Sequence, residues 1–423
     1  MQRRSALAAL ATAALLSAPT RARALSLDEA LELAVSHSPL VKRARAERQP
    51  IAALEVAAAL RLPANPLLSV AGGAYRLGSA AAASASSPAA VGAEWSLHLE
   101  QAIEVAGQRG RRLAEVGRSL AQATERERLA RSEAVARTRA AYVGALLGEQ
   151  LLAGERHREA LTAELLASVR LRAATGASSD VELQLAEVEH GRAASARVAA
   201  EAAREQAFAQ LRAAIAAPPD EPLSLTSALS PPAGEIPPLA DLTAAALARR
   251  ADLAALRAEE GVVDAGIARL RREAVPSVLL FVDAVTQPAL AGAPSQLYVG
   301  GGVGFALPVV DRNQGKLAVA AAERSRVQTE IGLAEEAIRH EVYLARDQLL
   351  RRRDESQNLI ERVVPAAERH LALVTEGWRA GKLDLFRVIS AARDEAGVRR
   401  DHLGVLGLLW QAAISLDRAT GAL

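Results

Sequence analysis

The two halves of the sequence carry the same landmarks in the same order, and this duplication limits the possible folds more than any other feature. Residues 107–110 (Gly-Gln-Arg-Gly) open a long stretch of helical character that breaks at Gly176. Residues 313–316 (Asn-Gln-Gly-Lys) open a similar stretch that breaks at Gly381. Gly110 and Gly315 are 205 residues apart, as are Gly176 and Gly381. Such a spacing indicates that one structural unit occurs twice.

Each half predicts an entry helix, a β-hairpin, a long helix, a tight turn and a returning helix. The first repeat covers 25–217 and the second 239–423, and 218–238 is too rich in proline for a helix, which favours a linker. Residues 106–172 contain no proline, and a helix of this length would span roughly 100 Å. The matching stretch, 315–377, is interrupted only by Pro365, where we expect a kink.

Aromatic residues make up only 3% of the chain, which is too few to fill several globular cores. The fold should instead bury narrow seams of Ala, Leu and Val between long helices. A period of two replaces the helical period only in four short segments, at about 67–77, 91–100, 277–287 and 295–307. About ten residues that alternate between apolar and polar or small are typical of a tilted barrel strand in a bilayer.

Two groups of residues follow from these strands. Glu94, His98 and Asp283 lie at polar positions and are expected to face the lumen of a barrel. The second group consists of aromatic residues suited to an interfacial girdle: Tyr75, Trp95, Phe281, Tyr298 and Phe305. A soluble hairpin packed on helices is the alternative. The hairpin loops would be 78–90 and 288–294.

Residues 1–24 have the pattern of a secretory signal peptide, with Arg3 and Arg4, an apolar stretch over 6–16 and an Ala-Arg-Ala ending. Cleavage is expected after Ala24, with twin-arginine export as a less favoured route. The chain has no cysteine, so we expect no lipid anchor, disulfide or thiolate metal site. No other stretch is long and apolar enough for a transmembrane helix. The balanced charge of the mature chain does not suggest a nucleic-acid partner.

The sequence offers no pattern for catalysis. The seven histidines include no pair at i, i+4 spacing that would place two metal ligands on one helical face. There is no phosphate loop, nucleophile elbow or dinucleotide fingerprint. We therefore predict no enzyme activity, no cofactor and no metal site. His98 lies between Glu94 and Glu100, which leaves open a weak contact with cations or, more simply, a solvated pore residue.

In the order and duplication of these elements, the chain resembles the TolC-like outer membrane efflux protein family over essentially its whole mature length. Residues 99–110 (Leu-Glu-Gln-Ala-Ile-Glu-Val-Ala-Gly-Gln-Arg-Gly) are similar to the strand-to-helix segment of the heavy-metal, CzcC-like branch. That branch usually has Gln-Pro where this chain has Gln101-Ala102. Residues 380–391 are similar to the second tip motif of the branch.

The resemblance implies a mainly α-helical protein with a membrane β-barrel. Three copies would each contribute four strands to a shared barrel and coiled-coil helices to a periplasmic tunnel in the cell outer membrane. Four strands cannot close a barrel alone, and an open edge in lipid is not tolerated, so the strand count also requires oligomerisation.

The function implied is that of the outer-membrane channel in a tripartite RND-type efflux system, with a periplasmic adaptor and an inner-membrane RND pump as partners. Heavy-metal cations are the favoured substrate. A channel for drug efflux and a channel for type I protein secretion are the alternatives. A periplasmic coiled-coil adaptor or a structural protein is possible from other classes. An adaptor should carry a lipoyl-like or β-barrel domain and an anchor, and a structural protein would not need alternating strands.

By resemblance, two turns would form the tips that dock the adaptor. Their residues are Thr175, Gly176, Ser178 and Asp180 at the first tip, and Gly381, Lys382 and Asp384 at the second. Glycine permits the left-handed turn that ends a helix, and either aspartate can cap the returning helix. Family members often carry acidic rings beyond the second tip, where this chain has Arg387 and Ser390. Asp384, Arg387 and Ser390 are the gate candidates, and one hypothesis pairs Arg387 with Asp384.

Overall fold

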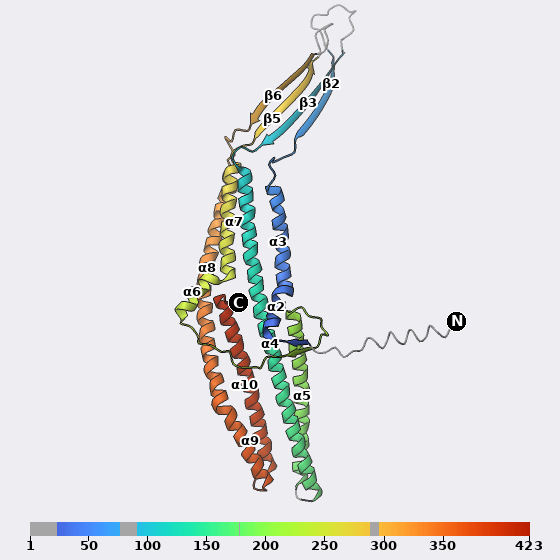
Figure 1. Ribbon diagram of the computed structural model, residues 1–423, viewed down its shortest axis with the longest axis vertical. Helices are drawn as coiled ribbons and strands as arrows, with labels where there is room; N and C mark the ends of the chain where they lie inside the picture. The colour runs from blue at the N-terminus through green and yellow to red at the C-terminus, as the bar shows by residue number, and fades with distance from the viewer. Residues whose placement is uncertain (1–22, 77–90, 177, 288–295) are drawn as a thin grey trace, which may run out of the picture. The chain divides into compact units, whose positions relative to one another are not determined.

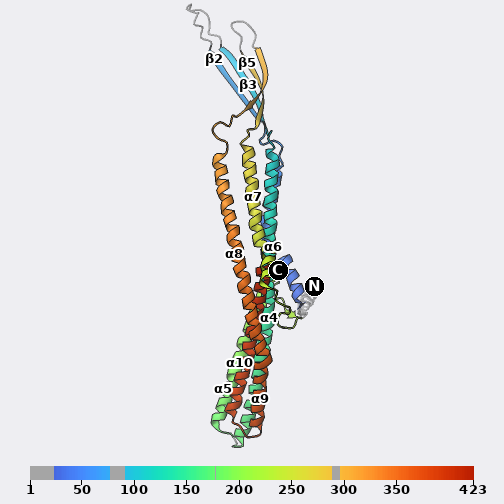
Figure 2. The same cartoon turned by 90° about the vertical axis from the view of Figure 1, so that its left-hand side faces the viewer.

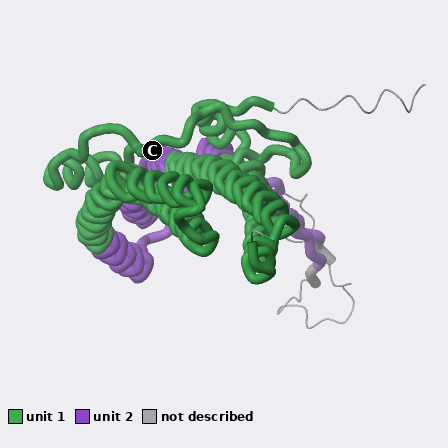
Figure 3. Tube along the Cα trace, turned by 90° about the horizontal axis from the view of Figure 1, so that it is seen from below, with its two compact units in different colours: residues 1–45, 126–253, 333–423 green, residues 46–125, 254–332 purple. Residues whose placement is uncertain are grey.

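The structure, a computed structural model, describes residues 23–76, 91–176, 178–287 and 296–423. Residues 1–22 of the expected signal peptide and the loops expected at 78–90 and 288–294 lie outside this description. The described chain folds into two compact units, and each unit takes segments from both halves of the sequence (Figure 3). Unit 1 includes 126–253 and 333–423, and unit 2 includes 46–125 and 254–332.

The same order of elements occurs in both halves (Figure 1). The first half contains α2 (Leu27–His37), α3 (Pro39–Ala58), β2 (Leu67–Arg76), β3 (Val91–Ile103), α4 (Gln108–Ala174) and α5 (Asp180–Ala214). The second half contains α6 (Leu239–Arg249), α7 (Ala251–Glu273), β5 (Val278–Gln287), β6 (Gln296–Phe305), α8 (Gln314–Asn358), the π-helical turn η1 (Leu359–Val363), α9 (Val364–Arg379) and α10 (Leu385–Thr420).

The interruption expected at Pro365 is present as a π-helical turn. The proline nitrogen has no hydrogen and cannot donate to a carbonyl one turn earlier. The helix widens over η1 and continues as α9, with Pro365 in its first turn. A π-turn of this kind is one of the recognised causes of a helix kink. Pro50, by contrast, lies inside α3 without ending it.

Four strands of unit 2 form one antiparallel sheet in the order β2-β3-β5-β6 (Figure 1), and Figure 2 shows three of them, β2, β3 and β5, from another side. The two hairpins join through β3 and β5, so the central pairing connects the first repeat to the second. Leu67 pairs with Glu100 in the first hairpin, and Val278 pairs with Phe305 in the second. Among the described residues, β2 and β6 are the edges of this sheet.

A second, smaller sheet was not expected from the sequence. β1 (Arg23–Leu25) pairs in parallel with β4 (Leu223–Leu225), which lies within the proline-rich segment predicted as a linker. Cleavage after Ala24 would remove two of the three residues of β1. The proline-rich segment also packs on unit 1 further along, where the indole nitrogen of Trp410 donates to the carbonyl of Ser230 at 2.9 Å.

The core of unit 1 beside β1 and β4 combines small residues with a few large ones. Its buried members are Leu25, Ala30, Tyr142, Ala145, Leu146, Phe208, Leu211, Ile215 and Leu223. Tyr142 is 1% exposed, and its hydroxyl lies 3.0 Å from both the carbonyl oxygen of Leu25 and the hydroxyl of Ser227. A single tyrosine on α4 therefore contacts the last residue of β1 and the segment just after β4.

We expect Tyr142→Phe to destabilise unit 1 by about 0.5–1.5 kcal/mol, because one hydrogen bond is lost while the carbonyl of Leu25 still accepts from the N–H of Thr226 at 3.2 Å. Guanidinium unfolding of the purified protein, followed by circular dichroism, measures the effect. Tyr343 lies on α8 of the second repeat and is 55% exposed, so Tyr343→Phe is the control and should unfold as the wild type does. Equal stability of both variants would show that the Tyr142 hydroxyl contributes nothing.

Candidate functional site

The sheet of unit 2 has one apolar and one polar face. Because directly paired residues of an antiparallel sheet point to the same side, the register assigns each residue to a face. One row across all four strands is Val70, Leu97, Ala284 and Val299, and the next is Leu68, Leu99, Val282 and Gly301. The large side chains of these two rows are all exposed in the single chain, from Leu97 at 37% to Val70 at 71%. A contiguous exposed apolar face of this kind indicates contact with lipid or protein.

The polar face brings two of the predicted lumen residues together. His98 and Asp283 are directly paired, and the Nδ1 atom of His98 lies 2.5 Å from a carboxylate oxygen of Asp283. The Nε2 atom of His98 lies 3.3 Å from Glu100. Glu94 pairs with Gly73 and lies on the same face. This face therefore carries a histidine between two carboxylates, with a further glutamate along the same strand.

The aromatic residues divide between the two faces. Trp95 and Phe305 lie in rows of the apolar face, whereas Phe281 pairs with Glu100 and Tyr298 with Val285, both on the polar face. The ring of Phe281 lies 5.8 Å from that of His98 and covers Gly302, where a Cβ atom would approach the ring to 2.5 Å. The side chain of Tyr75 lies outside the described part of the structure. A girdle on the apolar face thus keeps only Trp95 and Phe305 of the described aromatics.

The first tip connects α4 to α5. Gly176 adopts a left-handed conformation with φ of 72°, and the Thr175 hydroxyl donates to the carbonyl of Arg172 at 2.9 Å. The helix cap is Ser179, which exchanges hydrogen bonds with Glu182 at 3.1 and 3.2 Å. The prediction that Asp180 caps α5 was wrong, because Asp180 is the first residue of the helix and the capping box fits the preceding serine.

The Ser178 hydroxyl also contacts Glu182, so the tip residues after the turn are held by one glutamate of α5.

The second tip connects α9 to α10. Gly381 has φ of 70°, and the N–H groups of Gly381 and Lys382 donate to the carbonyls of Trp378 and Gly377 at 2.9 and 2.8 Å. Asp384 caps α10 as predicted, and its carboxylate accepts from the N–H of Arg387 at 2.9 Å. Within residues 296–423 no ion pair joins the two side chains, so Arg387 meets Asp384 through its main chain.

The gate candidates differ in exposure. Asp384 and Arg387 are exposed, and Ser390 is partly buried. Next to them lies Phe386, which no sequence pattern marked as a site residue and which is exposed although it is large and apolar. Val181, an exposed apolar residue in the first turn of α5, was likewise not predicted from the sequence. Each tip thus presents an apolar side chain beside its polar turn.

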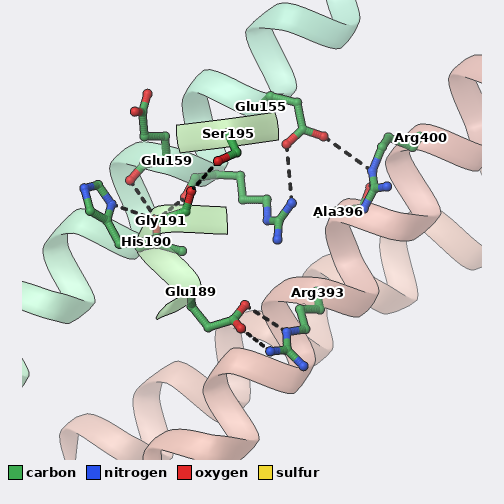
Figure 4. A network of polar contacts seen from close by, with 11 residues as sticks. Glu155, Glu159, Glu189, His190, Gly191, Ser195, Arg393, Ala396 and Arg400 are labelled. Carbon is green, nitrogen blue, oxygen red and sulfur yellow. Dashed lines mark hydrogen bonds and ion pairs between the residues drawn. The ribbon is translucent and has the colours of Figure 1, made fainter. Parts of the chain in front are cut away.

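Polar links join the two helical hairpins of unit 1 (Figure 4). Arg393 of α10 donates both Nε and a terminal nitrogen to the carboxylate of Glu189 on α5, the first at 2.9 Å. Glu189 is 2% exposed, and the hydrogen bonds from Arg393 hold its pKa below the ordinary value despite burial. Further along, Arg400 of α10 lies 3.4 Å from buried Glu155 of α4.

The ion pair between Glu189 and Arg393 could have been predicted from the position of Glu189 in the sequence. Ala186 and Ala193, three residues before and four after Glu189, are both buried, so Glu189 occupies the apolar stripe of α5. A carboxylate in such a position needs a cationic partner on the facing helix. Nearer the tips, an apolar cluster that includes Leu166, Val169 and Val388 joins the same hairpins, and the Arg172 guanidinium lies 4.5 Å from the ring centre of Trp378.

No described helix has the length and apolar character needed to cross a membrane. Across the ranges that the structure describes, no group of three or more His, Asp or Glu side chains is arranged to hold a metal ion.

Solved structures of outer membrane channels share this fold. CmeC of Campylobacter jejuni matches with a TM-score of 0.71 at 14% identity, over 93% of this chain and 85% of that one. VceC of Vibrio cholerae matches with a TM-score of 0.67 at 17% identity, over 93% and 96%. CusC, described as forming a transmembrane channel, matches with a TM-score of 0.70 at 16% identity, over 93% and 92%. The chain has the fold of an outer membrane channel.

In sequence, the chain is similar to the cobalt-zinc-cadmium resistance protein CzcC of Cupriavidus metallidurans. The two are 36% identical over 120 residues. The matched segment spans 28% of this chain and 29% of CzcC. No family model matches the chain. The resemblance to the heavy-metal branch is thus confirmed in fold and over this segment of sequence.

Replacing Glu189 should weaken unit 1 in a pH-dependent way. The pKa of Glu189 is lowered from 4.5 in the folded chain, so its stabilising effect is complete above pH 4.5 and is lost as the pH falls through the folded pKa. We expect Glu189→Gln to lower the free energy of unfolding at pH 7, and the deficit should shrink as the pH falls below 4.5.

Urea unfolding at several pH values measures this difference. Glu187 lies two residues earlier on α5 and forms an exposed pair with Arg170 at 2.9 Å, so Glu187→Gln is the matched control and should change stability by at most about 1 kcal/mol. A Glu189→Gln deficit that stays constant with pH would contradict a role for the ionised carboxylate.

Proposed function

We propose that this protein is the outer-membrane channel component of a tripartite RND-type efflux system. It would conduct heavy-metal cations from the periplasm or the pump to the exterior and would not catalyse a reaction. The observation that carries this proposal is the pairing of a channel fold with sequence similarity to a cobalt-zinc-cadmium resistance protein. The signal peptide expected at 1–24 fits export to the outer membrane.

The sheet supports a homotrimer. Its apolar face suits contact with the hydrocarbon of a bilayer, and each edge strand has a row of backbone groups that no other described strand of the chain pairs with. Unpaired backbone groups in hydrocarbon cost several kcal/mol each, so the sheet must continue into another sheet until it closes. Three copies supply twelve strands, and the helices of the three copies would surround a periplasmic tunnel.

The two tips are the proposed docking sites for the periplasmic adaptor. Lys382 and Asp384 at the second tip and Asp180 at the first are exposed, and Phe386 and Val181 add apolar surface beside them. Interface cores favour aromatic and apolar side chains within a polar rim, and each tip offers this combination on a small scale. Thr175, Gly176, Ser178 and Gly381 shape the turns that present these side chains.

Growth of a deletion strain and of its complemented parent tests the substrate class. We expect complementable sensitivity to cobalt, zinc or cadmium and unchanged sensitivity to a drug panel, since the channel serves a pump for metal cations. Sensitivity confined to drugs would overturn the metal assignment and favour a drug-efflux channel. A secretion defect without either sensitivity would favour type I protein secretion.

Arg387 is proposed to act at the gate beyond the second tip. Its exposed guanidinium, repeated in three copies, would place positive charge in the path of cations. We expect Arg387→Ala to raise the resting cation conductance of the purified channel in planar bilayers. Unchanged resting conductance and ion selectivity would remove Arg387 from the gate and leave it a solvated tip residue.

A further inference from the structure

The internal duplication fixes how the sheet of one copy joins the next. We infer that β6 pairs with β2 of a second copy in the register that places Val303 opposite Ala74, and that this pairing extends β6 through Val309. The inference rests on the proposed oligomeric channel and adds the residue contacts of its subunit junction. The β3–β5 junction within one chain is the template for the β6–β2 junction between chains.

Equivalent residues of the two repeats are identified by structure. Gly107 and Asn313 both have positive φ, 74° and 61°, immediately before α4 and α8. Gln108 and Gln314 follow them, and each side-chain oxygen accepts from the main-chain N–H two residues earlier, at 2.8 and 2.6 Å. A shift of 206 residues therefore carries the β3–α4 segment onto the β6–α8 segment, so Gly110 and Gly315, which are 205 residues apart, are not structurally equivalent.

A second shift relates β2 to β5. A shift of 210 residues carries Pro66, the proline before β2, onto Pro276, the proline before β5. Together the two shifts convert the pairing of Gly72 with Trp95 in the first hairpin into that of Val282 with Gly301, which is the pairing observed in the second. Both shifts are even and keep every residue on its face of the sheet. Three independent features thus agree on one alignment.

The template junction then gives the register between copies. Leu97 pairs with Ala284 where β3 meets β5. Applying the two shifts places Val303 of β6 opposite Ala74 of the partner subunit. The same operation places Phe305 opposite Gly72, Leu307 opposite Val70, and Val309 opposite Leu68. The six of these residues that lie in strands are on the apolar face, and Leu307 and Val309 have the same parity as Phe305, so the extended junction would continue the apolar rows.

The unequal lengths of the strands fit this junction. β3 runs to Ile103 because its last three residues pair with β5. β6 stops at Phe305, and no described strand of the chain pairs with residues 307–309, which are equivalent to 101–103. Leu307 and Val309 are exposed and apolar. Pairing with β2 of a second copy would order this segment as strand and cover both side chains.

Pro308 does not obstruct the extension. The N–H and C=O of Trp95 both face the Thr286 hydroxyl on the β5 side of β3, at 3.0 and 3.3 Å. Backbone groups alternate along a strand, so those of Ala102 face the opposite side. Pro308 is the equivalent of Ala102, and its nitrogen therefore points away from the second copy. Proline is tolerated on a strand at such a position.

A side-chain contact should accompany the strand pairing. Gln108 is 3% exposed and donates to the carbonyl of Val275 at 3.1 Å, which connects the start of α4 to the segment before β5. Gln314 is exposed and donates instead to its own chain, at the carbonyl of Val310. The 210-residue shift makes the carbonyl of Asn65 in the partner subunit the equivalent acceptor for Gln314.

Cysteine pairs test the register directly, because the natural chain has no cysteine and any disulfide is assignable. Val303→Cys is combined in turn with Val70→Cys, Gly72→Cys and Ala74→Cys, and the proteins are exported to the oxidising periplasm. We expect strong covalent oligomers on non-reducing gels only for the pair with Ala74→Cys, since directly paired residues lie about 5.5 Å apart at Cα, within disulfide range.

The pair Leu97→Cys with Ala284→Cys occupies the equivalent position within one chain and is the control for disulfide formation. The register would be overturned if Val303→Cys cross-linked most strongly with Gly72→Cys or Val70→Cys. It would also be overturned if none of the three pairs cross-linked while the control pair formed its disulfide. The mass of the wild-type oligomer in detergent and growth on metals are measured in parallel. A trimer that confers resistance but cross-links in another register contradicts only this inference, whereas a monomer contradicts the proposed channel as well.

Gln314→Ala supplies a second readout that needs no cysteine. We expect the oligomer to dissociate at a lower temperature in SDS than the wild type, because a hydrogen bond across the junction is lost. Gln328→Ala is the matched control, since Gln328 lies on the same helix and bonds to Glu260 within the chain. Equal dissociation temperatures for the Gln314→Ala variant and the wild type would contradict the predicted contact with Asn65.

Discussion

The backbone hydrogen bonds at the two edges of the sheet are the constraint on which the proposed assembly depends. β2 and β6 each have one neighbouring strand among the described residues. In water such edges could be solvated, but the apolar face of the sheet suits a medium that supplies no hydrogen bonds. The proposed trimer satisfies both requirements at once, because each edge finds the complementary edge of another copy. The duplication makes this simple, since the junction inside the chain already solves the same geometric problem.

The helices meet a different requirement, which is to pack closely with few large side chains. Buried alanines such as Ala186 and Ala193 let the helices of unit 1 approach, and the charged pair of Glu189 with Arg393 is set into the same seam. An apolar seam of small residues alone specifies helix register weakly, because neighbouring alanines are interchangeable. A buried carboxylate that loses its partner is costly, so this pair penalises a shift of one hairpin along the other.

How far the sequence predicts this structure depends on whether a feature is local. The hairpins follow from period-two alternation, the tips from Gly176 and Gly381, and the helix interruption from Pro365, and each of these signals lies within a few residues. β1 and β4 are three residues each and are defined only by their pairing across some 200 residues, so no periodicity could reveal them. The cap at Ser179 was missed because the adjacent Asp180 is also a favourable capping residue. Phe281 was misjudged because aromatic character alone does not determine the face of a strand.

The polar face of the sheet suits conduction better than selection. Phe281 covers Gly302, and Gly300 and Gly304 lie on the same face, so β6 offers few side-chain ligands there. The carboxylates of Asp283 and Glu100 already contact His98, which makes them poorer ligands for a passing cation. A pore must bind its ion weakly enough to release it, and a face with its charges internally paired meets that condition. Discrimination among metal ions would then require ligands elsewhere in the proposed tripartite system, and the channel could serve any cation that its partners deliver.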